Sequence, residues 1–401
     1  MTGAMTDRIS LTMGGQVYRT WTSFELTRDL SEISGSFQAE LRDATRHVSF
    51  PWADLMDLRA QVTAGLEVTV AIDGEPVLKG WVDEITPRCG GQVSVSVSGR
   101  DKTCDLIDCA ATVKGPWEYR RQKIDKIIAA IVKPFGLTVR ADVDLGDPID
   151  RVCIDVGEVA MSAIEKLCRQ RQVLVLSDGV GGIVLTRGGK GRGPADLVFP
   201  GGNVIESAGS DSMRERFSEY HVVAQGEKAG GKRKKKPAKL DVIAHPLGEG
   251  GSSGGSGGAS SGAYEQTGTK IVGTAKDDAV KRYRPMVVLA RNQCDAKIAQ
   301  AQAEWMSRTA RAAAIKLDYP VRDFQAGGKL WRPNELVMVK DSFQAIYRDL
   351  LIAGLVYSYG AQGAVTKLRL TGPEAFDLEP EGNRAKNHTQ PKKLDTVAHD
   401  L

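Results

Sequence analysis

A β pattern built around glycine occurs twice in this chain and constrains its fold more than any other feature. The two copies lie at residues 66–101 and 335–374. In the first copy Gly80 lies within a strand pattern, and after a Gly-rich turn an alternating strand reaches Gly99. In the second, Gly354 and Gly372 take these places, 18 residues apart where the first pair is 19 apart. Because a glycine inside a strand allows a sharp bend or the close approach of another backbone, we interpret both units as parts of small β-barrels or sandwiches.

The likeness of the two units has an alternative explanation and a consequence. Any two antiparallel meanders share alternation, so a chance likeness is the alternative. The shared spacing of a hydrophobic residue, glycine and valine favours a true duplication. Three copies of a chain with two related barrels would place six similar barrels around one axis. The pattern therefore leads to the hypothesis of a homotrimer that docks onto a six-fold partner.

The sequence between the two units predicts a small α+β domain. Isoleucines at helical spacing indicate a helix that stops at Pro134. Its apolar positions are Ile124, Ile127, Ile128 and Ile131. A second helix is expected at about 158–170, and a hairpin over 173–185 follows it. The expected core face of that helix is Ala160, Ala163, Ile164 and Leu167.

The sequence after residue 200 mixes several kinds of material. Residues 226–262 are rich in lysine, glycine and serine, and their small apolar surface cannot offset the entropy of ordering them, so we expect a flexible insertion that splits a β domain. A helix is expected at about 291–313, with Glu304 and Arg308 as a favourable i,i+4 pair. Its expected core face is Ile298, Ala301, Trp305 and Ala312. Residues 379–401 form a polar tail that we expect to be loosely ordered.

Charge and composition narrow the classes of function. The 54 basic and 50 acidic residues leave a net charge of +4, which is too small a global field to predict nucleic-acid binding. No run of 18 apolar residues occurs, so we expect no membrane insertion. The N-terminus does not resemble a secretory signal, and translation starts at Met1 or Met5. Six scattered cysteines are typical of thiols kept reduced in a cytoplasm, where we expect the chain to be made and folded.

Several stretches of the sequence resemble a known family. The motifs are Trp81-Val82-Asp83, Ser98-Gly99-Arg100-Asp101-Lys102-Thr103-Cys104-Asp105-Leu106-Ile107-Asp108-Cys109, Gly157-Glu158-Val159-Ala160-Met161-Ser162-Ala163-Ile164-Glu165-Lys166-Leu167-Cys168-Arg169-Gln170-Arg171, Ser177-Asp178-Gly179 and Leu185-Thr186-Arg187. With them the chain, over about residues 6–378, resembles the Mu-like phage baseplate hub proteins, which are also called tail or late control protein D relatives. The insertion at 226–262 departs from this resemblance.

The resemblance implies an α+β, mainly β fold, with two related tube-protein-like β-barrels and a small α+β domain between them. The expected domains are 6–105 (first β-barrel), 106–200 (small α+β domain), 201–378 (second β-barrel with helix 291–313 and insertion 226–262) and 379–401 (tail). It also implies a homotrimer that forms a pseudo-six-fold ring with a central channel. Other implied partners are the tail tube ring or a tube-like adaptor, the trimeric spike, baseplate wedge and tape measure proteins, and DNA that passes the channel without sequence-specific binding.

Two stretches invite a nucleic-acid or nucleotide interpretation. The basic run 233–236 has phosphate-binding charge, but without interleaved aromatic residues we interpret it as a solvated loop. The stretch 188–191 resembles a phosphate loop only faintly, because Gly191 stands after the lysine where Ser or Thr is required.

Candidate metal and catalytic residues also fit simpler interpretations. Cys104 and Cys109, with Cys89 upstream, lack the second pair of ligands that a zinc site needs. The histidines, which share no metal-binding spacing, are His47, His221, His245, His388 and His399. The adjacent acidic pairs, interpreted as surface charge, are Asp83-Glu84 and Asp277-Asp278. The Gly-x-Ser-x-Gly pattern occurs only within the Gly/Ser-rich residues 250–262, which lack the apolar strand and helix patterns that flank a nucleophile elbow. We therefore predict no catalytic, cofactor-binding or metal-binding residue.

The leading hypothesis is a structural hub of a contractile phage tail, located in the virion baseplate and assembled in the host cytoplasm, and not an enzyme. One alternative is the hub of a phage-derived bacteriocin or secretion apparatus. A second is a tail-associated cell-wall hydrolase, which would require a pair of carboxylates in a cleft.

Overall fold

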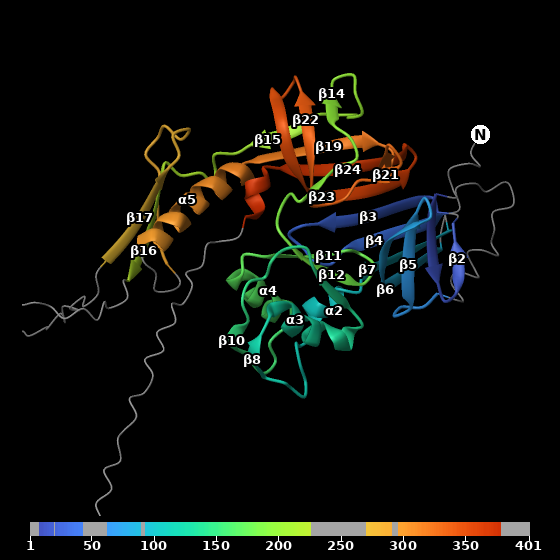
Figure 1. The fold of residues 1–401 in the computed structure, drawn as a ribbon. Helices are drawn as coiled ribbons and strands as arrows, with labels where there is room; N and C mark the ends of the chain where they lie inside the picture. The colour runs from blue at the N-terminus through green and yellow to red at the C-terminus, as the bar shows by residue number, and fades with distance from the viewer. Residues whose placement is uncertain are drawn as a thin grey trace, which may run out of the picture.

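The chain folds into one long β-sheet, a small α+β domain beneath it, and a sheet-and-helix module at one end (Figure 1). The computed structural model describes residues 8–19, 21–42, 62–89, 93–225, 270–290 and 296–377. The expected flexible insertion at 226–262 and the expected tail at 379–401 lie outside the described residues. The predicted fold class, α+β and mainly β, is confirmed.

The first β unit is a set of antiparallel strands with one buried face. They are β1 (Ile9–Met13), β2 (Gln16–Tyr18), β3 (Ser23–Asp29), β4 (Ser36–Arg42), β5 (Glu67–Ile72), β6 (Glu75–Cys89) and β7 (Val93–Asp101). Val68, Val70 and Ile72 of β5 are fully buried, and the residues between them are partly exposed, as period-two alternation requires. The strand pattern around Gly80 and the alternating strand that reaches Gly99 are confirmed as β6 and β7.

The small α+β domain has a core of its own. Its elements are α2 (Cys104–Asp108), β8 (Glu118–Gln122), α3 (Ile124–Val132), η1 (Lys133–Phe135), β9 (Thr138–Ala141), β10 (Ile149–Cys153), α4 (Ala160–Gln170), β11 (Leu174–Ser177) and β12 (Gly182–Thr186). The four isoleucines of α3 are buried, and the chain leaves η1 through Gly136 at a φ of 69°. The predicted core face of α4 is buried, so both helices and the hairpin are confirmed.

The second β unit carries the C-terminal strands. Its elements are β13 (Gly191–Arg192), β14 (Leu197–Phe199), β15 (Ala208–Asp211), β19 (Ile315–Arg322), β20 (Gln325–Ala326), β21 (Lys329–Leu330), β22 (Glu335–Asp341), β23 (Ile346–Gly360), β24 (Gly363–Thr371) and η2 (Pro373–Phe376). β13 and β14 pair with β22, so strands of the second unit begin at Gly191. The boundary expected from the sequence lay after residue 200.

A separate three-stranded sheet with one helix lies beside the second unit. Its elements are β16 (Glu219–Gln225), β17 (Lys270–Lys276), β18 (Pro285–Leu289) and α5 (Ala296–Ala313). A Cβ atom on Gly273 of β17 would lie 2.1 Å from the carbonyl oxygen of Ala299, so sheet and helix pack closely. The buried positions of α5 include the small residues Ala299, Ala303 and Ser307. Of the predicted core face, Ala312 is buried, whereas Ile298, Ala301 and Trp305 are partly exposed, so the prediction was only partly right.

The two β units share one strand arrangement. In the first, the order is β3-β4-β7-β6-β5, and in the second it is β15-β19-β24-β23-β22, with antiparallel pairs throughout. β6 and β23 both have 15 residues, β7 and β24 both have nine, and a short helix follows each unit. Each long strand has one extra residue in a bulge, Asp83 in β6 and Ala353 in β23. The duplication inferred from the sequence therefore extends over five strands.

The glycines that suggested this duplication are not equivalent. When the two units are aligned on their bulges, the position equivalent to Gly80 is Leu350, which lies four residues before Gly354. Gly99 corresponds to Leu370, since Gly99 pairs with Val82 as Leu370 pairs with Ile352. The match of glycine to glycine was wrong, because strand pairing and bulge position, and not glycine spacing, define the repeat.

The two units form one sheet. Residues Phe24–Asp29 of β3 pair with Gly354–Tyr359 of β23, so the first unit continues the second edge to edge. One hydrophobic core spans both, with Leu26 and Tyr357 opposite each other and both buried. The described pairings thus join the two expected barrels in a single 14-stranded sheet.

Candidate functional site

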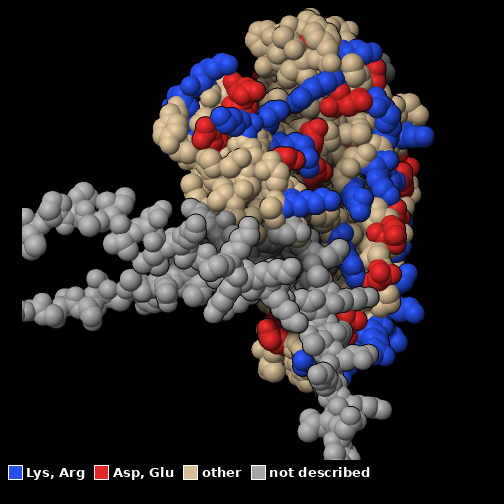
Figure 2. All heavy atoms as spheres, turned by 60° about the vertical axis from the view of Figure 1, so that its left-hand side comes forward, with Lys and Arg blue, Asp and Glu red and all other residues tan. Residues whose placement is uncertain are grey.

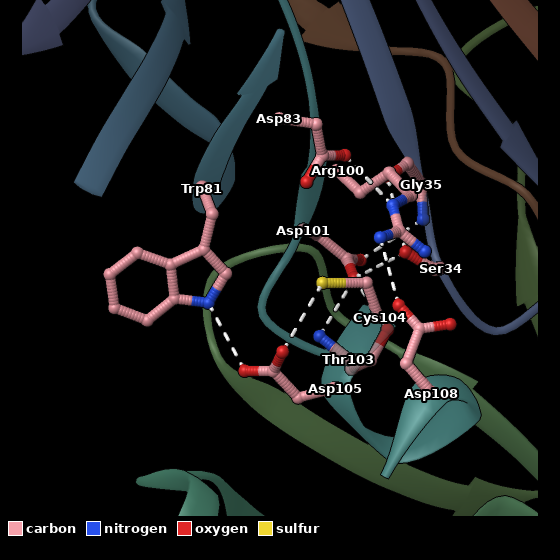
Figure 3. Close-up of polar contacts among 10 residues, drawn as sticks. All are labelled: Ser34, Gly35, Trp81, Asp83, Arg100, Asp101, Thr103, Cys104, Asp105 and Asp108. Carbon is pink, nitrogen blue, oxygen red and sulfur yellow. Dashed lines mark hydrogen bonds and ion pairs between the residues drawn. The ribbon is translucent and has the colours of Figure 1, made fainter. Parts of the chain in front are cut away.

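The buried carboxylate of Asp101 joins three parts of the molecule, and Figure 3 shows its contacts with Ser34, Gly35 and Thr103. It lies at the end of β7, where Oδ1 accepts hydrogen bonds from the Thr103 amide at 2.9 Å and from the Thr103 hydroxyl. Ser34, in the β3–β4 loop, donates to Oδ1 at 3.2 Å, and the Gly35 amide donates to Oδ2 at 3.2 Å. Ser177 of β11 donates to Oδ2 at 2.8 Å. One carboxylate therefore fixes the first β unit, the start of α2 and the small domain relative to one another.

Charged side chains hold α2 beneath the first unit. Arg100 donates to Asp83 at 2.8 Å and to Asp108 at 2.9 Å, and these hydrogen bonds raise the pKa of the guanidinium (Figure 3). The indole N–H of Trp81 donates to Asp105 at 3.2 Å. Residues 98–109, one of the motifs on which the family resemblance depends, thus form the connection between β7 and α2. The acidic residues Asp105 and Asp108 of this motif accept hydrogen bonds.

The β11–β12 hairpin of the small domain contacts the first unit directly. The Lys79 amide of β6 donates to the carbonyl of Gly179 at 2.6 Å. A Cβ atom on Gly179, where φ is 87°, would lie 2.4 Å from the carbonyl oxygen of Val77. Arg28 of β3 donates to the carbonyl of Ser177 at 2.5 Å. Only glycine allows this approach, which explains the role of the Ser-Asp-Gly motif.

A polar cavity of about 270 Å³ lies where the two β units meet the small domain. Its lining includes Arg28, Arg140, Lys190, Arg332 and Glu335. Burial raises the pKa of Glu335 to about 7, against the opposing effect of Arg332. One oxygen of this carboxyl, Oε2, is buried without a hydrogen-bond partner. The cavity therefore contains a carboxyl group that can gain a proton near neutral pH.

The β3–β23 junction combines backbone pairing with an ion pair. The Leu30 amide donates to the Ala353 carbonyl at 2.8 Å, next to the bulge of β23. Arg369 of β24 forms an ion pair with Asp29, across β23. A Cβ atom on Gly354 would lie 2.8 Å from Asp29 Oδ2, so this glycine leaves room for the ion pair. The junction therefore combines six residue pairs with the ion pair between Arg369 and Asp29.

The second unit has a buried carboxylate at another place. Asp341, at the end of β22, accepts hydrogen bonds from Tyr319 and Ser207 at 2.5 Å and from the amides of Phe343 and Gln344 at 2.8 and 2.9 Å. Burial raises the pKa of Asp341, but the hydrogen bonds outweigh it, and the pKa is lowered. This carboxylate ties the segment before β15 to the second unit.

One acidic residue interpreted as surface charge is buried. Asp277 is 2% exposed and pairs with Arg216, whose Nε lies 2.9 Å and whose Nη2 lies 3.1 Å from its two oxygens. The interpretation as surface charge was wrong for Asp277, because it connects β17 to the segment before β16. Asp278 beside it is exposed.

The other residues singled out in the sequence have structural surroundings. The stretch 188–191 connects the small domain to β13, and the Gly189 amide donates to Asn334 at 2.9 Å. Cys104 is buried, which raises the pKa of its thiol to about 12, whereas Cys109 is exposed. His221 contacts Glu219 at 3.1 Å. The residues outside the described part are Cys294, His47, His245, His388, His399 and the basic run 233–236.

Within the described ranges, no group of three His, Cys, Asp or Glu side chains is placed to hold a metal ion. No described helix is long and apolar enough to span a membrane. On the face in Figure 2, lysine and arginine side chains are interspersed with aspartate and glutamate. This face therefore offers mixed polar contacts and not a field of one sign.

Three family models match separate parts of the chain. The Mu phage baseplate assembly protein GpP-like N-terminal model matches residues 8–101, the baseplate hub protein gp44-like second-domain model matches 103–187, and the Mu phage baseplate assembly protein GpP fourth-domain model matches 295–379. The first match ends at Asp101, and the second ends after β12, where the small domain ends.

Similar proteins match over nearly the whole chain. The baseplate hub protein gp44 of Escherichia phage Mu is 28% identical over 387 residues, which are 95% of this chain and 92% of that protein. The 43 kDa tail protein of prophage MuSo2 from Shewanella oneidensis is 28% identical, with a TM-score of 0.72 over 92% of this chain and 99% of that one. A tail protein from Neisseria meningitidis MC58 is 18% identical and shares the fold, with a TM-score of 0.69 over 93% and 99% of the two chains.

Proposed function

We propose that this chain, which belongs to the Mu-like phage baseplate hub proteins, acts as a trimeric ring that joins the tail tube to the central spike. The chain is a structural protein of the tail baseplate. Membership of a structural family implies a role without catalysis. We place its assembly in the host cytoplasm.

The observation that carries this proposal is the duplicated five-strand unit. Two units of the same strand order lie edge to edge in one sheet. A trimer would contain six such units around one axis, and a three-fold protein would then match a six-fold tube ring. This symmetry match gives the duplication a mechanical reason, because each tube subunit would meet an equivalent surface.

The parts outside the duplicated strands supply the other contacts. The small domain and the β16–β18 module lie away from the sheet in different directions (Figure 1). We assign to them and to the outer surfaces the binding of the spike, of the baseplate wedge and of the tape measure protein. DNA passes through the channel of the ring without sequence-specific binding, in keeping with the net charge of only +4.

The mass in solution and the shape of the particle test this proposal. Sedimentation of the purified chain alone is expected to give the mass of three chains, and sedimentation with tube and spike proteins is expected to give a larger complex that contains three copies. Electron microscopy is expected to show a ring of six similar lobes. A mass of one chain in all mixtures would contradict the trimer. A trimer that binds neither the tube protein nor the spike would contradict the joining role.

A further inference from the structure

The internal junction between the two units is a template for a second junction. In the second unit, β22 pairs only with the N-terminal half of β23. The C-terminal half extends past β22, and the edge that β22 leaves open pairs with β3 of the first unit. The corresponding strand of the first unit, β6, extends past β5 in the same way. No strand of the described ranges pairs with residues 84–89 along this edge.

The complementary edge belongs to β15. By strand order, β15 of the second unit corresponds to β3 of the first. β3 pairs with β4 on one side and with β23 on the other, whereas β15 pairs with β19 and ends the described sheet. All four residues of β15 are exposed. Each chain thus has one occupied junction and the two separate halves of an equivalent one.

We infer that the C-terminal half of β6 in one copy pairs antiparallel with β15 of the next copy, in the register of the internal β23–β3 pair. The inference rests on the proposed trimer and specifies how its copies meet. Residues 84–88 correspond to 354–358, and 208–212 correspond to 25–29. The expected pairs are Glu84 with Ser212, Ile85 with Asp211, Thr86 with Ser210, Pro87 with Gly209, and Arg88 with Ala208.

The directions of the side chains agree with this register. In the internal junction, Leu26 and Tyr357 face the core together. Their counterparts are Gly209 and Pro87. A Cβ atom on Gly209 would lie 2.4 Å from buried Leu317, its partner on β19, so the exposed Gly209 lies on the same side of the sheet as the core. Ile85, the counterpart of core residue Leu355, packs partly exposed against the same core. A one-residue slip would reverse these faces.

The new pairs use small side chains, which lets two strands approach. Ala208, Gly209 and Ser210 place little bulk along the edge of β15. Pro87 lacks an amide hydrogen, so this junction has one backbone donor fewer than a strand without proline. With three junctions inside the chains and three between them, the ring closes and leaves no open edge at these strands.

Engineered cysteines test the register in the full-length chain. Thr86→Cys is combined with Ser210→Cys, after Cys89, Cys109, Cys153 and Cys294 are replaced by serine. Under mild oxidation the pair is expected to link separate chains into covalent dimers and trimers. Thr86→Cys with Ala208→Cys or with Ser212→Cys, each two residues out of register, is expected to link about ten-fold more slowly, because diagonal positions exceed disulfide geometry.

The internal junction supplies the matched positive control. Thr27→Cys with Val356→Cys occupies the equivalent positions and is expected to form a bond within one chain. A sedimenting trimer that links faster through an out-of-register pair, or through none of the three, would overturn the inferred junction and leave the trimer intact. A monomer in all mixtures would contradict both. Fast linking of the 86–210 pair within a trimer supports the junction.

Discussion

The two β units have the same five strands but differ in what connects the first two of them. In the first unit, β3 and β4 are joined by the six residues 30–35. In the second, the equivalent connection between β15 and β19 spans residues 212–314 and holds β16, β17, β18 and α5. The whole module is therefore an insertion into one hairpin. An insertion at a hairpin leaves the paired strands unchanged, so one unit can gain a new surface while both remain similar within the sheet.

The units also differ where their last long strand ends. At the end of β7, Asp101 gathers five hydrogen bonds from the loop, α2 and the small domain. The equivalent position after β24 is Gly372, where a Cβ atom would lie 2.8 Å from the Cβ of Ala312 in α5. A polar network closes the first unit, and close packing against a helix closes the second.

The largest expected effect concerns the hydrogen-bond network of Asp101 at the end of the first unit. Asp101→Asn replaces a buried acceptor with an amide that cannot accept all of these hydrogen bonds, and we expect a loss of about 3 kcal/mol in the free energy of unfolding. Urea unfolding and hydrogen exchange at the connection between β7 and α2 measure this loss of stability. The matched control is Asp83→Asn, an exposed partner of Arg100, with an expected loss of about 0.5 kcal/mol. Equal losses for both variants would show that the network does not close the unit.

The second largest expected effect concerns Gly99, a position where the first unit requires glycine and the second does not. A Cβ atom on Gly99 would lie 2.0 Å from the Trp81 carbonyl oxygen, whereas its counterpart in the second unit is Leu370. Gly99→Ala is expected to lower the free energy of unfolding by about 2 kcal/mol, because backbone must shift. Thermal unfolding measures it. Gly360→Ala, with no atom within 4 Å, is the control and is expected to change stability by less than about 0.5 kcal/mol.

These glycines show how far the sequence predicts the fold. Alternation predicted the strands of both units, and helical spacing predicted α3 and α4, since these patterns report burial directly. The equivalence of the units was predicted with the glycines in the wrong register, because the spacing of the glycines does not reveal the bulges at Asp83 and Ala353, which define the repeat. Strand pairing between β3 and β23, some 330 residues apart, has no local signal either.

The residues of the candidate site divide in the same way, into those with a local sequence pattern and those that only the folded chain brings together. The motif around Asp101 was visible as a family resemblance, but its carboxylate has partners from Ser34 to Ser177, which only the folded chain brings together. The cavity around Glu335 was not predicted, because its lining comes from three separate parts of the chain. A lone glutamate at the start of a strand pattern carries no signal of burial.

A pH effect separates the two units at the position of Glu335. Its counterpart in the first unit is Leu66, by the pairing of β5 and β22 with their long strands. Burial raises the pKa of Glu335 from 4.5 to about 7 in the folded chain. The folded state therefore holds the proton more tightly, and stability is expected to fall as pH rises between these two values.

The expected loss is about 1 kcal/mol, less than the full shift implies, because the side chain is partly exposed to solvent. Urea midpoints from pH 4.5 to 8 measure it. Glu335→Leu, which copies the first unit, and Glu335→Gln are both expected to remove this part of the pH dependence. An unchanged pH dependence in both variants would assign the effect to other groups.

The smallest effect concerns how the short helix after each unit is held. In the first unit Arg100 pairs with Asp108 of α2 at 2.9 Å. In the second, Arg308 of α5 pairs with Asp377, after η2, at 3.0 Å. The i,i+4 pair of Arg308 with Glu304 was expected from the sequence, but Glu304 instead accepts a hydrogen bond from Gln300 at 2.8 Å.

Double-mutant cycles distinguish the two possible partners of Arg308. Because the side chains are half-exposed, Arg308→Ala combined with Asp377→Ala is expected to show a coupling of about 0.5 kcal/mol, and with Glu304→Ala about 0.2 kcal/mol or less. Added salt is expected to reduce the first value, since solvent-exposed ion pairs are screened. A larger coupling to Glu304 would mean that α5 stabilises itself and does not hold η2. The second unit would then be closed by the packing of Gly372 against Ala312 and by the hydrogen bonds that Thr371 and Trp305 donate to the carbonyls of Ala312 and Asp377.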